Sequence, residues 1–323
     1  MNLIKRREFT LLILIIIQIL LITLRAPRFF NISNFRDILD DTAILFMVAI
    51  GQMLVILTSG IDLSVASSLA FSGMSVALLN QYHPEISVFI ILFLSIIIGF
   101  ILGSFNGLLV AYGNIPPIIT TLGTMSIYRG LVFVLSKGTW VSAHEMTDSF
   151  RLFPRIHVFG ISSLLIISLV VIILFSIFLY YTRTGREIYG VGGNITAAQY
   201  VGINLRKIRY LVFALGGGIC GLSGFLWVAR YASAQSDTAI GFELQTIAAC
   251  VIGGTSIAGG SGSIMGVVLG ALFLGIIKNA LPVINVSPFW QMFIQGFIII
   301  VAIIINTVMS QRNQQLILKK REL

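Results

Sequence analysis

The chain has 323 residues, of which 57% are hydrophobic and 10% are charged, and its formal net charge is +9. A soluble domain of this length would carry roughly 25% charged residues. The composition therefore excludes a soluble globular protein and predicts an all-α protein that crosses a membrane several times. We expect residues 1–323 to form a single transmembrane domain.

Ten apolar runs predict about ten transmembrane helices, since a helix needs roughly 20 apolar residues to cross a bilayer. In chain order the runs are residues 9–24, 42–59, 63–80, 86–112, 115–135, 159–181, 208–229, 242–258, 262–281 and 289–306. Only Gly60-Ile61-Asp62 separates the second run from the third, and only Gly259-Gly260-Ser261 separates the eighth from the ninth. Eight to eleven helices would also fit, and we expect some to be broken or re-entrant.

Lys and Arg are unevenly distributed between the two predicted sides of the membrane. With the N-terminus taken as cytoplasmic, one side holds twelve Lys and Arg and four Asp and Glu, and the other holds eight of each. Because basic residues accumulate in cytoplasmic loops, this distribution predicts a cytoplasmic N-terminus, a cytoplasmic loop at 182–209 and a cytoplasmic tail at 307–323. The basic excess is thus explained by topology, and nucleic-acid binding is an unneeded explanation.

The loop at 182–209 is the largest polar segment on the predicted cytoplasmic side. Glycine and asparagine allow turns in it, at Gly185, Gly190, Gly192, Gly193, Asn194 and Gly202. Residues 196–200 are compatible with a short helix, flanked by Arg186 and Arg206, which predicts a surface that fits a groove on a cytoplasmic partner. The alternative is a solvated basic loop. No GxxxxGK[ST] motif occurs in the chain, so if transport costs ATP, another chain hydrolyses it.

Few ionisable residues lie within the predicted spans, where they usually mark function. Asp62 follows a helix break, where it either caps the next helix or contacts a solute or ion directly. Arg129 lies in a run that opens with Pro116-Pro117, where a re-entrant helix would line a cavity; the alternative is pairing with Asp62 or Glu243. Lys278 and Glu243 lie near span ends and are expected to reach the interface. A transporter driven by protons or sodium normally carries more ionisable residues within its spans. The sequence therefore argues against coupling to ions.

Glycines are clustered in the last third of the chain. Gly262, Gly266 and Gly270 are spaced four apart, which predicts close helix packing. Alternatively, the glycine-rich stretch 253–262 forms a discontinuous helix beside the pathway. Residues 55–61 faintly resemble residues 251–257, which leaves an internal duplication open.

Only one predicted external loop, residues 136–158, is substantial. Its Trp140, His144 and Glu145 are candidates for docking a partner, although Trp at a membrane interface is also ordinary anchoring. The three histidines, His83, His144 and His157, all fall in predicted external loops and suggest neither a catalytic group nor a metal site.

Several motifs, in the same order along nearly the whole chain, resemble the permease subunits of monosaccharide ABC importers, the ribose-type group of the branched-chain amino acid permease superfamily. They are Gly60-Ile61-Asp62-Leu63-Ser64, Asn106-Gly107, residues 115–124, Tyr128-Arg129-Gly130, residues 192–202, residues 249–254 and residues 259–262. Within the group, residues 140–146 and 278–284 look most like rhamnose-type permeases, with autoinducer-2 and ribose permeases close behind.

The resemblance implies a transport subunit, no enzyme, in the inner membrane of a bacterium. It implies three kinds of partner: a second permease copy or paralogue, ABC ATPase chains that use ATP and Mg, and a soluble sugar-binding protein. No cofactor or metal is expected on this chain. The rival functions are a secondary transporter and a passive facilitator of small polar solutes.

The resemblance also assigns roles to residues. The loop would couple the ATPase to transport through Gly185, Arg186, Gly192, Gly193, Asn194, Ala197, Ala198 and Gly202. Candidates for the translocation pathway are Asp62, Asn106, Thr120, Thr121 and Arg129. We expect alternating access, in which movement of the coupling loop tilts the flanking helices.

Overall fold

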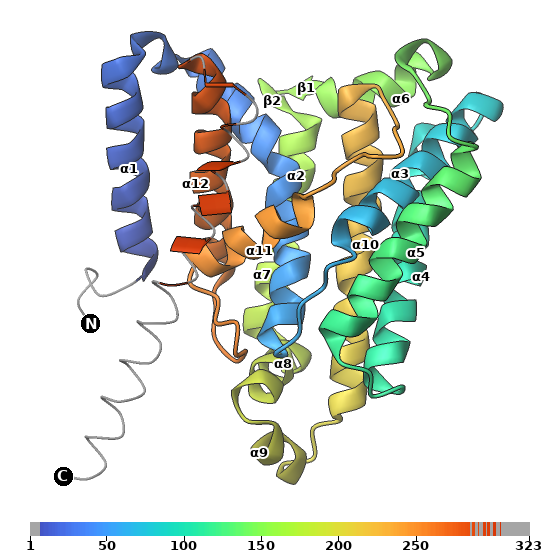
Figure 1. Cartoon of the computed structure of the whole chain (residues 1–323), viewed down its shortest axis with the longest axis vertical. Helices are drawn as coiled ribbons and strands as arrows, with labels where there is room; N and C mark the ends of the chain where they lie inside the picture. Colours follow the sequence, from blue (N-terminus) through green and yellow to red (C-terminus); the bar gives the residue numbers. More distant parts are fainter. Residues whose placement is uncertain are drawn as a thin grey trace.

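Long helices pack side by side along one axis in the computed structural model (Figure 1), which describes residues 7–284, 286–287, 290, 293–294, 296–297, 300–301 and 304. The long helices are α1 (Arg7–Arg25), α2 (Ile32–Leu57), α3 (Val65–Tyr82), α4 (Val88–Ala111), α5 (Pro117–Ser136), α7 (Ser163–Tyr181), α10 (Leu205–Tyr231) and α12 (Ile264–Val283). The short helices are α6 (Asp148–Leu152), α8 (Arg183–Gly193), α9 (Ile195–Tyr200) and α11 (Phe242–Ile252), and β1 (His157–Val158) pairs with β2 (Ile161–Ser162) in an antiparallel hairpin. Among the described residues, seven helices are long and apolar enough to cross a membrane, namely all the long ones except α3.

The two ends of the bundle differ. Helices α8 and α9 lie at the lower end in Figure 1, directly below the last turn of α2, while α1 begins near mid-height and runs upward. The hairpin β1–β2 and α6 lie at the upper end. The start of α1 is therefore the end of that helix nearer to the basic loop, and a cytoplasmic N-terminus stays a prediction.

Eight of the ten predicted runs coincide with a long helix, but α2 starts well before residue 42. Asn31 caps α2, and its side chain accepts a hydrogen bond from Ser33 N at 3.2 Å. Hydropathy missed the first turns because they carry Arg36, Asp37, Asp40 and Asp41.

The run 242–258 was predicted to be one span, which is wrong. Helix α11 covers only 11 residues and ends at Ile252, about 16 Å at roughly 1.5 Å per residue. A glycine-rich loop follows, with φ of 87° at Gly254, 91° at Gly259 and 71° at Gly260. These left-handed conformations favour glycine and confirm a discontinuous element at 253–262. The run 289–306 and the tail 307–323 lie outside the continuously described residues.

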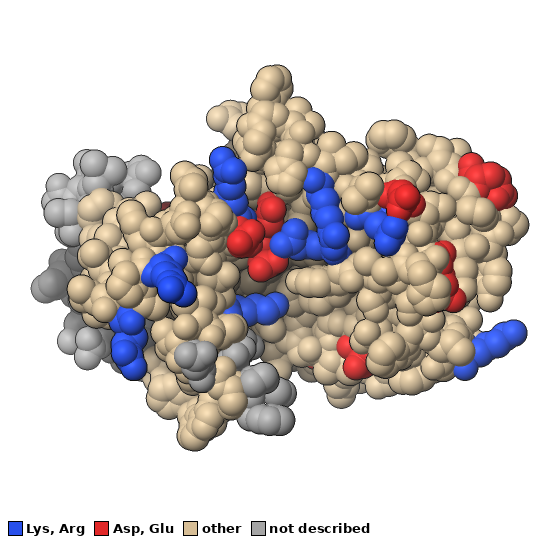
Figure 2. Space-filling model, turned by 90° about the horizontal axis from the view of Figure 1, so that it is seen from above, with Lys and Arg blue, Asp and Glu red and all other residues tan. Residues whose placement is uncertain are grey.

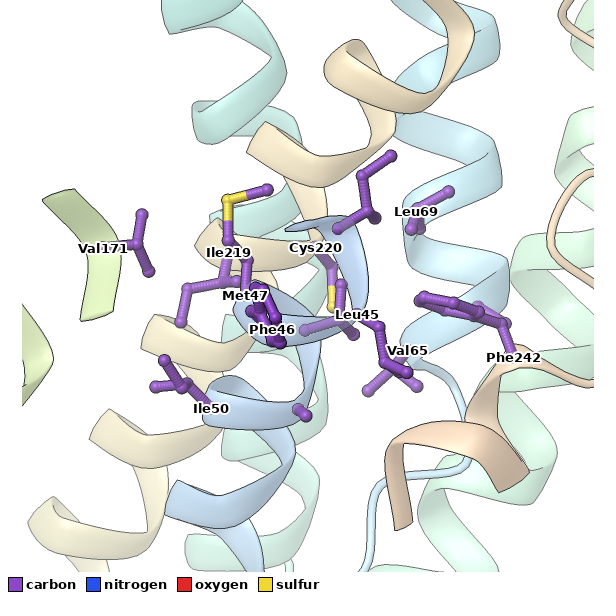
Figure 3. Packing of buried hydrophobic residues seen from close by; sticks show 14 of the residues in the cluster. Leu45, Phe46, Met47, Ile50, Val65, Leu69, Val171, Ile219, Cys220 and Phe242 are labelled. Atoms are coloured by element: carbon purple, nitrogen blue, oxygen red, sulfur yellow. The ribbon is translucent and has the colours of Figure 1, made fainter. Parts of the chain in front are cut away.

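Helix α2 occupies the centre of the bundle. From Thr42 to Leu57 every residue is buried, as expected for a helix that is apolar on all sides. Figure 3 shows Leu45, Phe46, Met47 and Ile50 of α2 among Val65 and Leu69 of α3, Val171 of α7, Ile219 and Cys220 of α10, and Phe242 of α11.

Glycines let neighbouring backbones touch. A Cβ built on Gly217 of α10 would lie 2.3 Å from Gly99 O of α4, and one built on Gly221 would lie 2.1 Å from Ser95 O. On α12, a Cβ on Gly266 would lie 2.2 Å from Gly253 O, and one on Gly270 would lie 2.2 Å from Ala249 O. Close packing at these two glycines is therefore confirmed.

Gly217→Ala is expected to destabilise the bundle. The added methyl group would force α4 and α10 apart, and overpacking typically costs about 1–3 kcal/mol. The matched control is Gly130→Ala on α5, where a Cβ would have no described neighbour within 4 Å. Thermal unfolding of both purified variants is the measurement: Gly217→Ala should lower Tm and Gly130→Ala should not. Equal Tm values would contradict this account of the α4–α10 contact.

Candidate functional site

The break between α2 and α3 carries Asp62, which is buried. After α2, Ser59 adopts a left-handed φ of 63°, and Gly60 N donates to Val55 O at 3.1 Å. Asp62 Oδ1 then accepts two hydrogen bonds from Ser64, one from its backbone N at 2.8 Å and one from its Oγ at 2.7 Å. The prediction that Asp62 caps α3 is wrong by two residues, because the capping position is Ser64. Asp62 instead fixes the turn that leads into the helix.

Ser64 links the break to α4 and α5. Its Oγ accepts from Asn106 Nδ2 at 2.8 Å, and Asn106 Oδ1 accepts from Tyr128 OH at 3.2 Å. The Tyr128 hydroxyl also lies 2.8 Å from Leu102 O. Asn106 and Ser64 are completely buried, so each bond replaces one to water that burial removes.

Gln52 of α2 completes this arrangement from the other side. Its side-chain amide, oriented to satisfy both atoms, donates to Asp62 O at 3.0 Å and accepts from Asp62 N at 3.2 Å. We call Gln52, Asp62, Ser64, Asn106 and Tyr128 the polar network. It joins α2, α4 and α5 at the break.

The two threonines of α5 lie near the polar network. Thr121 Oγ1 lies 2.9 Å from Pro117 O and 3.2 Å from Ile61 O, so it holds the start of α5 against the break. Thr120 is buried, and its Oγ1 has no hydrogen-bond partner among the described residues. The structure thus brings Asp62, Asn106 and Thr121 together.

Arg129 does not belong to the polar network. Its Nη1 donates to Ser236 O at 2.9 Å and to Thr238 O at 2.8 Å, which fastens the loop between α10 and α11 to α5. Within the described part of the chain no ion pair joins Arg129 to Asp62 or Glu243, so the predicted pairing is wrong. Two carbonyl oxygens solvate the guanidinium instead.

The predicted coupling loop contains a helix where turns were predicted. Gly185, Gly190, Gly192 and Gly193 all lie within α8. Close packing explains two of these glycines: a Cβ on Gly185 would lie 2.3 Å from Leu179 O, and one on Gly192 would lie 1.7 Å from Leu57 O. The short helix predicted at 196–200 is confirmed as α9.

Helix α8 contacts both helix breaks. Gly192 packs on the end of α2, and Gly260 N of the 253–263 loop donates to the same Leu57 O at 3.0 Å. Ser59 Oγ donates to Ala258 O at 2.7 Å, which joins the two breaks directly. Tyr189 OH donates to Gly262 O at 3.0 Å, and burial raises the pKa of the Tyr189 phenol, so it stays a donor.

The other residues of the predicted coupling loop divide into two groups. Ala198 is buried. Arg186, Gly193, Asn194, Ala197 and Gly202 are exposed. The Asn194 side chain caps α9 by accepting from Ala197 N at 2.9 Å. The exposed group forms the free surface of the lower end.

At the upper end, the three docking candidates differ in their contacts. Trp140 and His144 are exposed. Glu145 binds within the protein through both oxygens, accepting from Ser142 N at 2.7 Å and from Gln81 Nε2 at 2.7 Å. Glu145 thus ties its loop to α3, while docking through Trp140 and His144 stays a prediction.

Sequence reasoning missed Gln52, Ser64 and Tyr128 as site residues. Ser64 and Tyr128 lie inside the motifs that carry the resemblance, beside residues that were chosen. Gln52 had one visible signal, because it is an amide in the middle of an apolar run.

Comparisons with known proteins agree with the membrane fold. A family described as branched-chain amino acid transport system / permease component matches residues 34–303. The chain is 36% identical to the ribose import permease protein RbsC of Haemophilus influenzae, over 96% of this chain and 95% of that protein. It is 37% identical to RbsC of Escherichia coli, over 91% and 92% of the two chains, and 31% identical to the autoinducer 2 import system permease protein LsrC of Salmonella typhi, over 92% and 84%. No solved structure matched.

Proposed function

Because the chain belongs to this family of transport permeases, we propose that it is the membrane-spanning permease subunit of an ATP-driven importer of a monosaccharide. It is a transport component and no enzyme. ATP and Mg are used by a separate ATPase chain at the lower end, which we assign to the cytoplasm, with the N-terminus on the same side. A soluble sugar-binding protein delivers the solute to the upper end, and a second permease copy or paralogue completes the pathway in a bacterial inner membrane.

The observation that carries this proposal is the contact of α8 with both helix breaks. Movement of α8 acts on the end of α2 through Gly192 and on the 253–263 loop through Tyr189. These two segments lead into α3 and α12 respectively. A push on α8 therefore reaches two long helices at once, which is what alternating access driven from the cytoplasm requires.

The supported substrate class is a small sugar-like solute, as in the names of the relatives. Rhamnose, suggested by residues 140–146 and 278–284, stays a prediction, because the relatives compared above are named for ribose and autoinducer 2. In these systems the binding protein is expected to supply most of the selectivity.

Uptake measurements separate this function from its rivals. Cells that express the chain with its ATPase and binding protein should take up labelled D-ribose or L-rhamnose, and ATP depletion should abolish the uptake while an uncoupler with ATP maintained should not. Uptake that collapses with the uncoupler would indicate a secondary transporter. Solute movement through the chain reconstituted alone would indicate a facilitator. An ATPase should also co-purify with the chain.

A further inference from the structure

A cavity of about 330 Å³ opens at the upper end, among α2, α11, α12 and the end of α10. Figure 2 looks onto this end and shows Lys and Arg gathered with Asp and Glu around a hollow near its middle. Ligand pockets span roughly 300–1,000 Å³, so this cavity has room for one small solute. It is separate from the polar network, because none of the five network residues lines it.

Four charged or amide side chains line the cavity, from three different helices. They are Asp41 of α2, Gln245 of α11, and Lys278 and Asn279 of α12. Asn279 Oδ1 is buried and has no hydrogen-bond partner among the described residues. A buried acceptor without a donor is unfavourable, and a hydroxyl group in the cavity would supply the missing donor.

The charges around the cavity balance one another. Asp41 pairs with Arg230 at the end of α10, and Asp40 Oδ2 lies 3.9 Å from Arg230 Nη1. Lys278 adds one positive charge to the cavity wall. Of these four charged residues, Asp41 and Lys278 line the cavity itself, and their charges are opposite. This balance disfavours a charged solute and favours a neutral one that both donates and accepts hydrogen bonds.

The rest of the wall is apolar and partly aromatic. Tyr231 and Phe242 contribute their rings, and Trp227, packed against both at 5.2 and 5.1 Å between ring centroids, holds them in place. Aromatic rings present a large rigid apolar surface, which suits the C–H face of a sugar ring. The amides and charged groups can form hydrogen bonds with the hydroxyl groups of a sugar, while the aromatic surface packs against its C–H face.

We propose that this cavity binds one neutral monosaccharide within a single protomer, before the solute enters the translocation pathway. The proposal rests on the import function proposed above. The sugar hydroxyls donate to Asn279 Oδ1 and Asp41 and accept from Lys278 and Gln245. At the cavity wall α2 and α12 touch, since a Cβ on Gly275 would lie 2.0 Å from Thr42 Oγ1, so the solute cannot pass between these helices until they separate.

Protection from a thiol reagent tests occupancy in the assembled importer. Val283 lines the cavity and is replaced in Val283→Cys, while Ser149→Cys places a thiol on exposed α6 as the control. Both native cysteines are buried. Saturating D-ribose or L-rhamnose, whichever the parent imports, should slow labelling of Val283→Cys by 2-(sulfonatoethyl) methanethiosulfonate at least threefold and leave Ser149→Cys unchanged. Equal labelling of Val283→Cys with and without sugar would overturn the proposal.

Uptake by two further variants gives an independent result. Asn279→Leu and Gln245→Leu replace the two amides by branched apolar side chains and so remove the hydrogen-bonding groups. We expect uptake to fall at least tenfold while the ATPase still co-purifies. If both variants take up sugar as fast as the parent, sugar binding in the cavity is refuted and the proposed import function is unaffected. Failure of the parent itself to show ATP-dependent uptake would refute both.

Discussion

Gly192→Val and Gly193→Val are expected to fail in different ways, although the two glycines are adjacent. A Cβ on Gly192 would lie 1.7 Å from Leu57 O and 2.5 Å from Gly260 N, whereas one on Gly193 has no described neighbour within 4 Å. Backbone atoms cannot yield as a flexible side chain can. Gly192→Val should therefore lift α8 off both helix breaks.

The expected results distinguish two effects, namely loss of the packing of α8 against the helix breaks and loss of ATPase binding. Gly192→Val should lower Tm of the purified permease, because overpacking costs about 1–3 kcal/mol or more, and it should reduce uptake at least tenfold. Gly193→Val should leave Tm unchanged and instead weaken co-purification of the ATPase, since Gly193 lies on the exposed surface of the loop.

Gly190→Ala is the matched control within the same helix, because a Cβ there would lie 3.5 Å from Ile203 Cδ1, an ordinary van der Waals contact. It should retain Tm, ATPase binding and uptake. Normal uptake by Gly192→Val would show that transport does not depend on the contact between α8 and Leu57. Normal co-purification of the ATPase with Gly193→Val would contradict a coupling role for the exposed surface of the loop.

The helices could be predicted from the sequence because hydropathy reports burial and lipid contact along the chain. The limits appear where charged residues of one helix pair with a residue far away in the sequence. The first turns of α2 were missed since Asp40 and Asp41 lower the local hydropathy, although both pair with Arg230 across the bundle. Long-range ion pairs of this kind leave no local pattern.

Glycine was the least predictable residue, because it serves two opposite purposes. In the 253–263 loop, Gly254, Gly259 and Gly260 adopt positive φ and shape the turns that follow α11. In α8, Gly185 and Gly192 stay helical and provide close contact with a neighbouring backbone. Local sequence cannot distinguish these uses, since the deciding atoms belong to distant segments.

The polar network could be predicted in part. Its members Asp62 and Asn106 were selected from motifs, as was Thr121, which contacts the same break through Ile61 O. Gln52 was missed because its partner is the backbone of Asp62, and backbone partners have no sequence signature. The alternative pairing of Arg129 with a carboxylate was wrong for the same reason, since Arg129 binds the carbonyl oxygens of Ser236 and Thr238. Its place in the translocation pathway stays a prediction.

Asp62→Asn is expected to retain uptake within about threefold of the parent, whereas Asp62→Leu should abolish it. Both hydrogen bonds from Ser64 end on the same oxygen, Asp62 Oδ1. Asparagine keeps an oxygen at that position, so the turn into α3 survives without the charge. Leucine leaves the Ser64 N–H and hydroxyl without their acceptor in a buried site, at about 1–3 kcal/mol for each unmade bond.

The pair of variants decides whether Asp62 acts through its hydrogen bonds or its charge. If the carboxylate bound a cation or solute, Asp62→Asn would lose uptake as completely as Asp62→Leu, with an unchanged Tm. Asn106→Leu supplies the control, because it removes the donor to Ser64 Oγ and the acceptor of Tyr128 OH from the neighbouring helix without touching Asp62. It should lower both Tm and uptake, as Asp62→Leu does, because α3, α4 and α5 depend on the same chain of hydrogen bonds for their positions around the break.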